Sequence, residues 1–353
     1  NASLINSAID SKASQLELQD MMESQSMTRF VIDKREREEL ENAWKASGVT
    51  CVVQNTGEEG NGISRLLKRL SNFTYSTDMM SEFVRKAVSP NDILQAKKEN
   101  RHALYFTGNG VPLPQDWISV EDELRYISVF FNLGIRMMHL TYNRRNVIGD
   151  GCAETANGGL SDFGRHVVKE MNRVGVIVDI AHSGWQTSLE AAQTSEKPMV
   201  ASHTTVASIN KHIRSKPDPV IRAIADTGGY IGICSIPRFL GGSGDISMVM
   251  KHIDYVVKNF GSDHVAIGTD VAYRSRFSGE ESSKIATRKP ERTRWEALWP
   301  PDDFKESSGM IQSLAWTNWP LFTVGMVQMG YSDEVIQKIL AGNVMRVAKA
   351  ALT

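Results

Sequence analysis

The chain has 353 residues, with 40 Lys and Arg against 41 Asp and Glu and a formal net charge of -1 at pH 7. This balance, without long blocks of one sign, argues against binding to nucleic acid or to an anionic membrane surface. No apolar run reaches the roughly 18 residues of a membrane-spanning helix. The three cysteines, Cys51, Cys152 and Cys234, fit neither a zinc-knuckle spacing nor a paired disulfide framework, so we expect free thiols.

The first part of the chain leads from a polar segment into a repeat of strands and helices. Residues 1–26 are polar and rich in Ser, Gln and Met, which is typical of a surface arm. Phe30–Ile32 then predicts a strand, and a charged helix follows until Gly48, which predicts its end. Further helices are predicted around residues 63–70 and 77–87.

Eight apolar runs with helical patterns between them predict eight strands. They begin near Phe30, Thr50, Ala103, Ile135, Val176, Met199, Tyr230 and His264. Eight such units favour a closed (β/α)8 TIM barrel of the α/β class. An open doubly wound sheet is the alternative, but no Gly-x-Gly-x-x-Gly pattern follows the first strand. We predict one barrel domain over residues 27–353, with a lid-like insertion around residues 272–308.

Three of these runs end in residues that bind metals. Val176–His182 and Met199–His203 each end in a histidine, and His264–Asp270 ends in a carboxylate. The C-terminal ends of parallel barrel strands open onto one face, so we expect the two imidazoles and the carboxylate to converge on a metal ion. Histidines inside predicted strands and helices, such as His139 and His252, are expected to serve in packing.

Several segments in a fixed order resemble a known family. They are Gly134–Arg136, Leu140–Asn143, Gly158–Gly164, Met171–Gly175, Asp179–His182 and Ser202–His203, with a weaker likeness at Gly330–Ser332 and Gly342–Asn343. Together they resemble the membrane dipeptidase (renal dipeptidase) family, peptidase family M19. The resemblance implies a metallo-dependent (β/α)8 hydrolase that cleaves dipeptides with the help of two zinc ions.

The same resemblance implies roles for four residues. His182 and His203 would be ligands of one zinc ion, and Asp270 would be the catalytic carboxylate that handles the proton of the attacking water. Arg214 would hold a carboxylate of the substrate, because a planar guanidinium offers two parallel donors. The expected partner is therefore a small molecule with a free carboxylate.

Other positions depart from the family pattern. The first strand should end in His-x-Asp, but by register Arg35 and Arg37 stand at these places, and the third strand, around Phe106–Gly110, offers no glutamate. We therefore expect at most one zinc ion. We also hypothesise that Arg35 or Arg37 occupies the space of the missing metal and pairs with Asp270, since a carboxylate in a water-poor pocket needs a cation.

Tyr142 and Asn143 follow the fourth strand, where the family has a histidine, and are expected to line the substrate site. The sequence thus predicts a dipeptidase-like metallohydrolase with zero or one zinc ion. The alternative is a relative without peptidase activity, which carries out a metal-free or single-metal elimination or isomerisation, or which only binds a small carboxylate. We expect a homodimer, as in relatives. The sequence leaves the compartment open: the start at Asn1 without Met fits export to the periplasm or the exterior after signal removal, and it fits a trimmed N-terminus equally well.

Overall fold

The computed structural model describes residue 12 and residues 28–57, 62–277, 295, 298–300 and 314–353. Nearly all of the predicted arm, residues 1–26, lies outside this part of the chain, as does most of the predicted insertion around residues 272–308. The domain limits drawn from the sequence therefore stay predictions.

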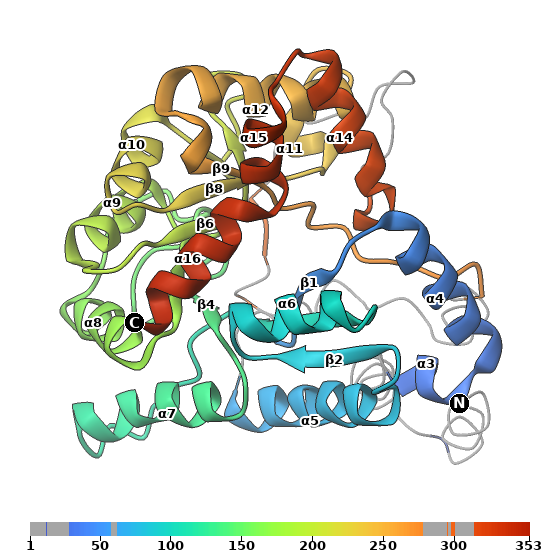
Figure 1. The fold of residues 1–353 in the computed structure, drawn as a ribbon. Coiled ribbons are helices and arrows are strands. Elements are labelled where there is room, and N and C mark those ends of the chain that lie inside the picture. Colours follow the sequence, from blue (N-terminus) through green and yellow to red (C-terminus); the bar gives the residue numbers. More distant parts are fainter. Residues whose placement is uncertain (1–11, 13–27, 58–61, 278–294, 296–297, 301–313) are drawn as a thin grey trace.

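Parallel strands form a single curled sheet (Figure 1). The strands are β1 (Cys51–Asn55), β2 (Val84–Ala87), β3 (His102–Gly108), β4 (Met137–His139), β5 (Ile177–Asp179), β6 (Val200–Val206), β7 (Ser215–Lys216), β8 (Tyr230–Ile233) and β9 (Val265–Ile267). Hydrogen-bonded neighbours follow the order β1, β3, β4, β5, β6, β8 and β9, with β2 beside β3 and β7 beside β6. The predicted α/β barrel type of architecture is confirmed.

Helices cover the outer side of the sheet. They are α3 (Thr28–Ile32), α4 (Lys34–Ser47), α5 (Ile63–Met79), α6 (Pro90–Lys98), α7 (Val120–Asn132), α8 (Asp162–Val174), α9 (Trp185–Thr194), α10 (Asp218–Asp226), α11 (Pro237–Leu240), α12 (Ile246–Phe260), α14 (Trp319–Gln328), α15 (Asp333–Gln337) and α16 (Asn343–Leu352), with short turns η1 (Ser262–His264), η4 (Trp316–Asn318) and η5 (Lys338–Gly342). In Figure 1, α8, α9 and α10 lie on the left and α12 and α14 at the top. None of the described helices is both long and apolar enough to cross a membrane.

Local capping explains where several helices begin and end. The Ser119 hydroxyl accepts the N–H of Asp122 at 3.0 Å at the start of α7, and the Ser161 hydroxyl accepts the N–H of Gly164 at 2.9 Å at the start of α8. Gly48 ends α4 in the left-handed region with φ of 70°. The two serine caps fix the starts of α7, which connects β3 to β4, and of α8, which connects β4 to β5. The C-terminal ends of these strands carry the candidate site.

Two segments differ from the prediction. Phe30–Ile32 is not a strand but part of helix α3, and Asp33 then caps α4 by accepting the N–H of Arg35 at 2.9 Å. A run of three apolar residues contains no period by which a strand can be told from a helix. Val84–Ala87 was predicted to end a helix, but it forms strand β2, which pairs with β3. The side chains of Val84 and Ala87 are buried there, and the charged residues Arg85 and Lys86 between them are half-buried.

The strand order leaves a seam, which we define as the gap between β1 and β9. Among the described residues, no ladder of hydrogen bonds joins these two strands. Side chains bring the two parts together instead. Trp44 of α4 meets Trp316 of η4 with ring centroids 5.0 Å apart, and Glu39 of α4 accepts the Tyr273 hydroxyl at 3.0 Å. The closed ring of eight strands predicted from the sequence is therefore open within the described part of the chain.

Candidate active site

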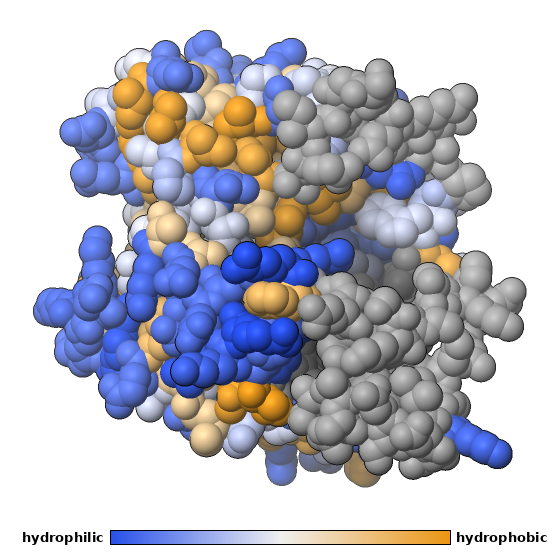
Figure 2. Space-filling view, turned by 90° about the vertical axis from the view of Figure 1, so that its right-hand side faces the viewer, coloured by the Kyte–Doolittle hydropathy of each residue, from blue (hydrophilic) through white to orange (hydrophobic). Residues whose placement is uncertain are grey.

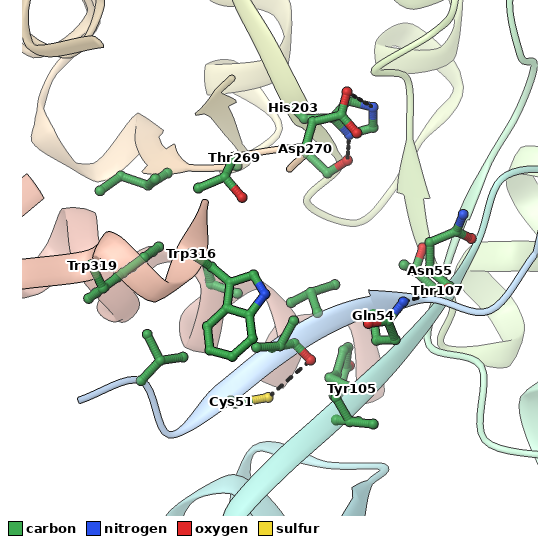
Figure 3. A pocket seen from close by; sticks show the side chains of 18 of the residues that line it. Cys51, Gln54, Asn55, Tyr105, Thr107, His203, Thr269, Asp270, Trp316 and Trp319 are labelled. Carbon is green, nitrogen blue, oxygen red and sulfur yellow. Dashed lines mark hydrogen bonds and ion pairs between the residues drawn. The ribbon is translucent and has the colours of Figure 1, made fainter. Parts of the chain in front are cut away.

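A cavity of about 1160 Å³ lies inside the curled sheet and extends to the seam. Both strands at the seam contribute to its wall, with Val52 of β1 and Ile267 of β9 among the lining residues. Figure 3 shows His203 and Asp270 next to each other at one end of the cavity, across from Trp316, Cys51 and Tyr105. A concave space of this size, with a few polar groups on a mostly apolar wall, is typical of a small-molecule site.

Two histidines predicted as metal ligands lie together at the cavity wall. Nε2 of His182, just after β5, lies 3.0 Å from Nε2 of His203 on β6. Two nitrogen ligands of one tetrahedral zinc ion lie about 3.4 Å apart, given zinc–nitrogen distances of about 2.1 Å. Without a cation, one ring nitrogen donates a hydrogen bond to the other. Their separation is also close to that of two ligands of one zinc ion. The structure therefore brings this predicted pair together.

The second nitrogen of each ring is held by a neighbouring polar group. Nδ1 of His182 donates to the amide oxygen of Asn143 at 2.8 Å, and Nδ1 of His203 lies 2.8 Å from the hydroxyl of Ser202. Such contacts orient the imidazole and leave Nε2 available for a metal. Burial lowers the pKa of His203 to about 4, and burial together with Arg214 lowers the pKa of His182 well below its ordinary value. Both rings are neutral at pH 7, as metal ligands must be, so the residues present fit a divalent cation.

Asp270 lies beside this pair. Its carboxylate oxygen Oδ2 is 4.0 Å from Nε2 of His203, and its side chain is 36% exposed toward the cavity. The backbone of Asp270 has φ of 56°, in the left-handed region that few residues other than glycine adopt. Held in this conformation just after β9, the carboxylate is accessible to a ligand and close to the histidines. A strained residue at such a place is a common property of functional sites.

Two further residues complete the cluster, and sequence reasoning missed both. His139 of β4 and Asp179 of β5 are paired in register, and Nε2 of His139 lies 2.8 Å from Oδ2 of Asp179. Together with His203 they form a group in which the ligand atoms lie within 4.8 Å of one another. His139 was expected to serve in packing. The signal that could have found them is a polar residue at the end of each of two consecutive buried strands.

The family comparison decides the identity of the chain. A model of the membrane dipeptidase family, peptidase family M19, matches residues 3–285. The chain belongs to this family. The family assignment supports a metallo-dependent, dipeptidase-like hydrolase.

Solved structures agree with the family assignment. An amidohydrolase from Pseudomonas aeruginosa is 27% identical, with 89% of this chain and 93% of that chain covered and a TM-score of 0.72. The probable dipeptidase PvdM from the same organism has 17% identity, covers 88% of each chain and has a TM-score of 0.69. A metallo peptidase from Rhodobacter sphaeroides, liganded with a phosphinate mimic of the dipeptide L-Ala-D-Ala, has 15% identity, coverage of 92% and 96%, and a TM-score of 0.70. The last two show the likeness of the fold alone.

The predicted substrate residues of this M19 chain occupy different places. Tyr142 lines the cavity and stacks on His182, with ring centroids 3.9 Å apart and an angle of 22° between the rings. Asn143 is fully buried behind it and contacts His182 rather than the cavity. Tyr142 can therefore touch a ligand, whereas Asn143 positions an imidazole.

Arg214 is not where a substrate carboxylate could reach it in this structure. The residue is fully buried, and its guanidinium donates to the backbone carbonyls of Ala181 and, at 3.1 Å, of His203. These two carbonyls belong to the segments that carry the histidine pair. Contrary to the expectation from the sequence, Arg214 lies behind the histidines and ties their backbones together.

The hypothesis about Arg35 and Arg37 is wrong in its premise. Both residues lie on helix α4 and not at the end of a strand, because Phe30–Ile32 is helical. Nη2 of Arg35 pairs with Asp33 at 3.0 Å, and Nε of Arg37 pairs with Glu41 at 2.9 Å. Each arginine thus has a carboxylate partner close in sequence, and neither is placed as a substitute for a metal beside Asp270.

Proposed function

We propose that this M19 chain hydrolyses a dipeptide-like amide bond with one zinc ion. The observation that carries the proposal is the convergence of Nε2 of His182 and Nε2 of His203, 3.0 Å apart, beside the Asp270 carboxylate. His182 and His203 would hold the zinc ion. When bound, zinc would polarise the amide carbonyl and activate a water molecule near neutral pH.

Asp270 would manage the proton in this reaction. Its carboxylate faces the cavity, so it can accept a proton from the attacking water and afterwards donate it to the leaving amine. Tyr142, stacked on His182, would form the wall against which the substrate lies. The apolar part of the cavity would take the side chains of the dipeptide.

The charges behind the site favour a substrate with a free carboxylate. Arg214 and Lys216 are fully buried, and their hydrogen bonds go to backbone carbonyls and to the Ser188 hydroxyl. Burial and, after it, the positive charge of Arg214 lower the pKa of His182, which supports an effect of this charge at the site. An anion in the cavity would be attracted by this field, since buried charges interact strongly in a medium of low dielectric.

Hydrolysis of a panel of dipeptides, followed by release of free amine, tests the proposal. We expect turnover in the presence of zinc and a loss of about a hundredfold or more in kcat for Asp270→Asn, because general acid–base groups contribute about 10² to 10⁴ in rate. His252→Gln is the matched control, since His252 is a buried histidine on α12 whose ring nitrogens bond to the backbone of Val206 and Leu240. No turnover of any dipeptide by zinc-loaded protein contradicts the proposal.

One observation favours a second candidate function. The end of β3 brings Asn109 to the cavity wall, and the segment Phe106–Gly110 contributes no carboxylate that could bridge two metal ions. A relative with this change is suited to an elimination or isomerisation without a metal or with one metal, or to binding of a small carboxylate alone. Binding of carboxylate ligands without their hydrolysis would favour this candidate.

A homodimer is also part of the proposal. Helix α14 exposes Leu321, Val324 and Val327, although its other side packs in the core through Phe322 and Met326. Figure 2, which looks onto the side where α4 and α14 lie, shows apolar surface in its upper half and strongly hydrophilic surface below. An exposed apolar face of this kind is typical of a contact between copies of a chain.

A further inference from the structure

The histidine pair alone provides too few ligands for the proposed metal. Catalytic zinc is normally held by three protein ligands and one open position. His182 and His203 supply two nitrogens, and the nearest cavity carboxylate, Asp270, lies 4.0 Å from Nε2 of His203. A complete site in this chain needs a further ligand from residues that the family resemblance does not name.

His139 and Asp179 are buried in a way that their own contacts do not explain. His139 is 2% exposed and Asp179 is 0% exposed. Nδ1 of His139 has no hydrogen-bond partner among the described residues, and the one close side-chain contact of Oδ2 of Asp179 there is Nε2 of His139 at 2.8 Å. Buried polar atoms without hydrogen bonds are rare and call for a ligand, an ion or a water.

The backbone fixes the two side chains against each other. His139 and Asp179 are direct partners in the ladder between β4 and β5, so both side chains project from the same side of the sheet. The other carboxylate oxygen, Oδ1 of Asp179, accepts the backbone N–H groups of Ala181 and Ser202, each at 3.0 Å. These bonds orient the carboxylate so that Oδ2 is turned toward His139.

Three imidazoles lie at nearly equal distances from one another at this place. The ring centroids of His139 and His182 and those of His139 and His203 are 5.3 Å apart, and those of His182 and His203 are 5.1 Å apart. The ligand atoms of His139, Asp179 and His203 lie within 4.8 Å of one another, a spread that small side-chain movements around one cation would close.

We propose that His139 and Asp179 are metal ligands and, with His203, form a site of two histidines and one carboxylate. Three adjacent strands, β4, β5 and β6, supply one ligand each, and His182 lies at the edge of the site with its Nε2 beside that of His203. Two histidines with one carboxylate leave open positions for water and substrate and suit zinc or another divalent transition metal. This inference rests on the proposed function, because it identifies the ligands of its metal.

Metal binding measured without any substrate tests the inference. The protein is purified without chelator, its metal content is determined by mass spectrometry, and the metal-free protein is then titrated with Zn²⁺ and with Co²⁺. The change in melting temperature and the visible absorption of bound Co²⁺ report affinity and coordination. The variants are His139→Gln, Asp179→Asn and His182→Gln, with His252→Gln as a control for replacing a buried histidine elsewhere.

We expect wild type and His252→Gln to bind one metal ion with the same affinity. His139→Gln and Asp179→Asn should each weaken binding about a hundredfold or more, since loss of an outer contact of a ligand already costs about 10- to 100-fold. His182→Gln should still bind Co²⁺, but more weakly and with a changed spectrum, because Nε2 of His182 lies at the edge of the site. Far-ultraviolet circular dichroism and the melting temperature of the metal-free variants establish that each one folds, and Asp179→Asn keeps the oxygen that accepts the two backbone N–H groups.

Two other results would overturn the inference, and they are distinguishable. If His139→Gln and Asp179→Asn bind metal as wild type does while His182→Gln loses it, the metal belongs to His182 and His203 alone, and the proposed hydrolase stands. If wild type binds neither Zn²⁺ nor Co²⁺, the inference and the zinc-dependent function fail together, and wild type and the four variants all give the same flat titration.

Discussion

Asn143 controls the state of His182, although it does not reach the cavity. Its amide oxygen accepts the Nδ1 proton of His182 at 2.8 Å, and Cys152 lies behind it, with its sulfur 3.6 Å from the same oxygen. The contact selects the imidazole tautomer whose free electron pair is on Nε2. A buried amide thus decides which nitrogen of the ring faces His203.

Asn143→Ala should weaken Zn²⁺ binding by about 10- to 100-fold, because the imidazole loses the partner that orients it. Isothermal titration calorimetry with the metal-free protein measures the change. Asn259→Ala is the control, since Asn259 is exposed and its side chain donates to the carbonyl of Tyr255 within its own helix. An unchanged affinity in Asn143→Ala would show that the tautomer is set elsewhere.

Lys216 should make the stability of the fold depend on pH. Burial lowers its pKa to about 7, against an ordinary value of 10.5, so between these values the unfolded chain binds a proton that the folded chain does not. Stability attributable to Lys216 is therefore lowest below pH 7 and rises as the pH increases toward 10.5. The methionine variant, Lys216→Met, removes this titration.

The advantage of Lys216→Met over wild type should shrink by about 2 kcal/mol between pH 7 and pH 9, at about 1.4 kcal/mol for each unit of pKa difference that is traversed. Urea unfolding of both proteins at several pH values measures it. Comparison of the two proteins cancels the titration of the buried thiols, since burial raises the pKa of Cys51 to about 12 in both. A constant difference in stability would show that Lys216 stays charged in the fold.

At the scale of elements, the loop after β4 holds the site against the loop after β5. Gly151 forms a bridge with Ser183, and the N–H of Cys152 donates to the carbonyl of His182 at 2.7 Å. A Cβ atom on Gly151 would overlap the backbone of Tyr142 and Asn143. Only glycine allows this close approach of the two loops.

Gly151→Ala should therefore lower the free energy of unfolding by about 1 to 3 kcal/mol, the usual cost of overpacking, and reduce metal affinity by displacing Asn143. Gly62→Ala is the matched control, because nothing lies within 4 Å of a Cβ atom there and its φ is not positive. Denaturant unfolding and zinc titration of both variants measure the two effects. Equal behaviour of the two alanine variants would contradict this account of the loop.

The elements also show what the sequence could predict. His182 and His203 were found because each of them ends an apolar run that the sequence shows directly. The pairing of His139 with Asp179 depends on the register between β4 and β5, which no spacing within one strand reveals. The helix at Phe30–Ile32 was mistaken for a strand because three apolar residues fit both.

The whole molecule offers one apolar face for assembly, on α14. Val324→Asp should convert a dimer into a monomer without loss of stability, since Val324 is 49% exposed and a carboxylate in an apolar contact must be desolvated. Size-exclusion chromatography with light scattering gives the mass of each form. Ile118→Asp is the control at an exposed apolar residue away from α14, and it should leave the mass unchanged. A monomeric wild type would remove the basis for the dimer.

Side chains, and not the sheet, hold the described residues together across the seam between β1 and β9. Within the described residues, the two halves of the barrel meet there through Trp44 on Trp316 and through Glu39 with Tyr273 and Arg276, and no ladder crosses between the strands. Separation of these rings and this acidic side chain would break none of the described β-bridges. The strands that carry the proposed metal ligands, β4, β5 and β6, lie in the middle of the strand order and are held by their own ladders, so their rigidity does not depend on the contacts at the seam.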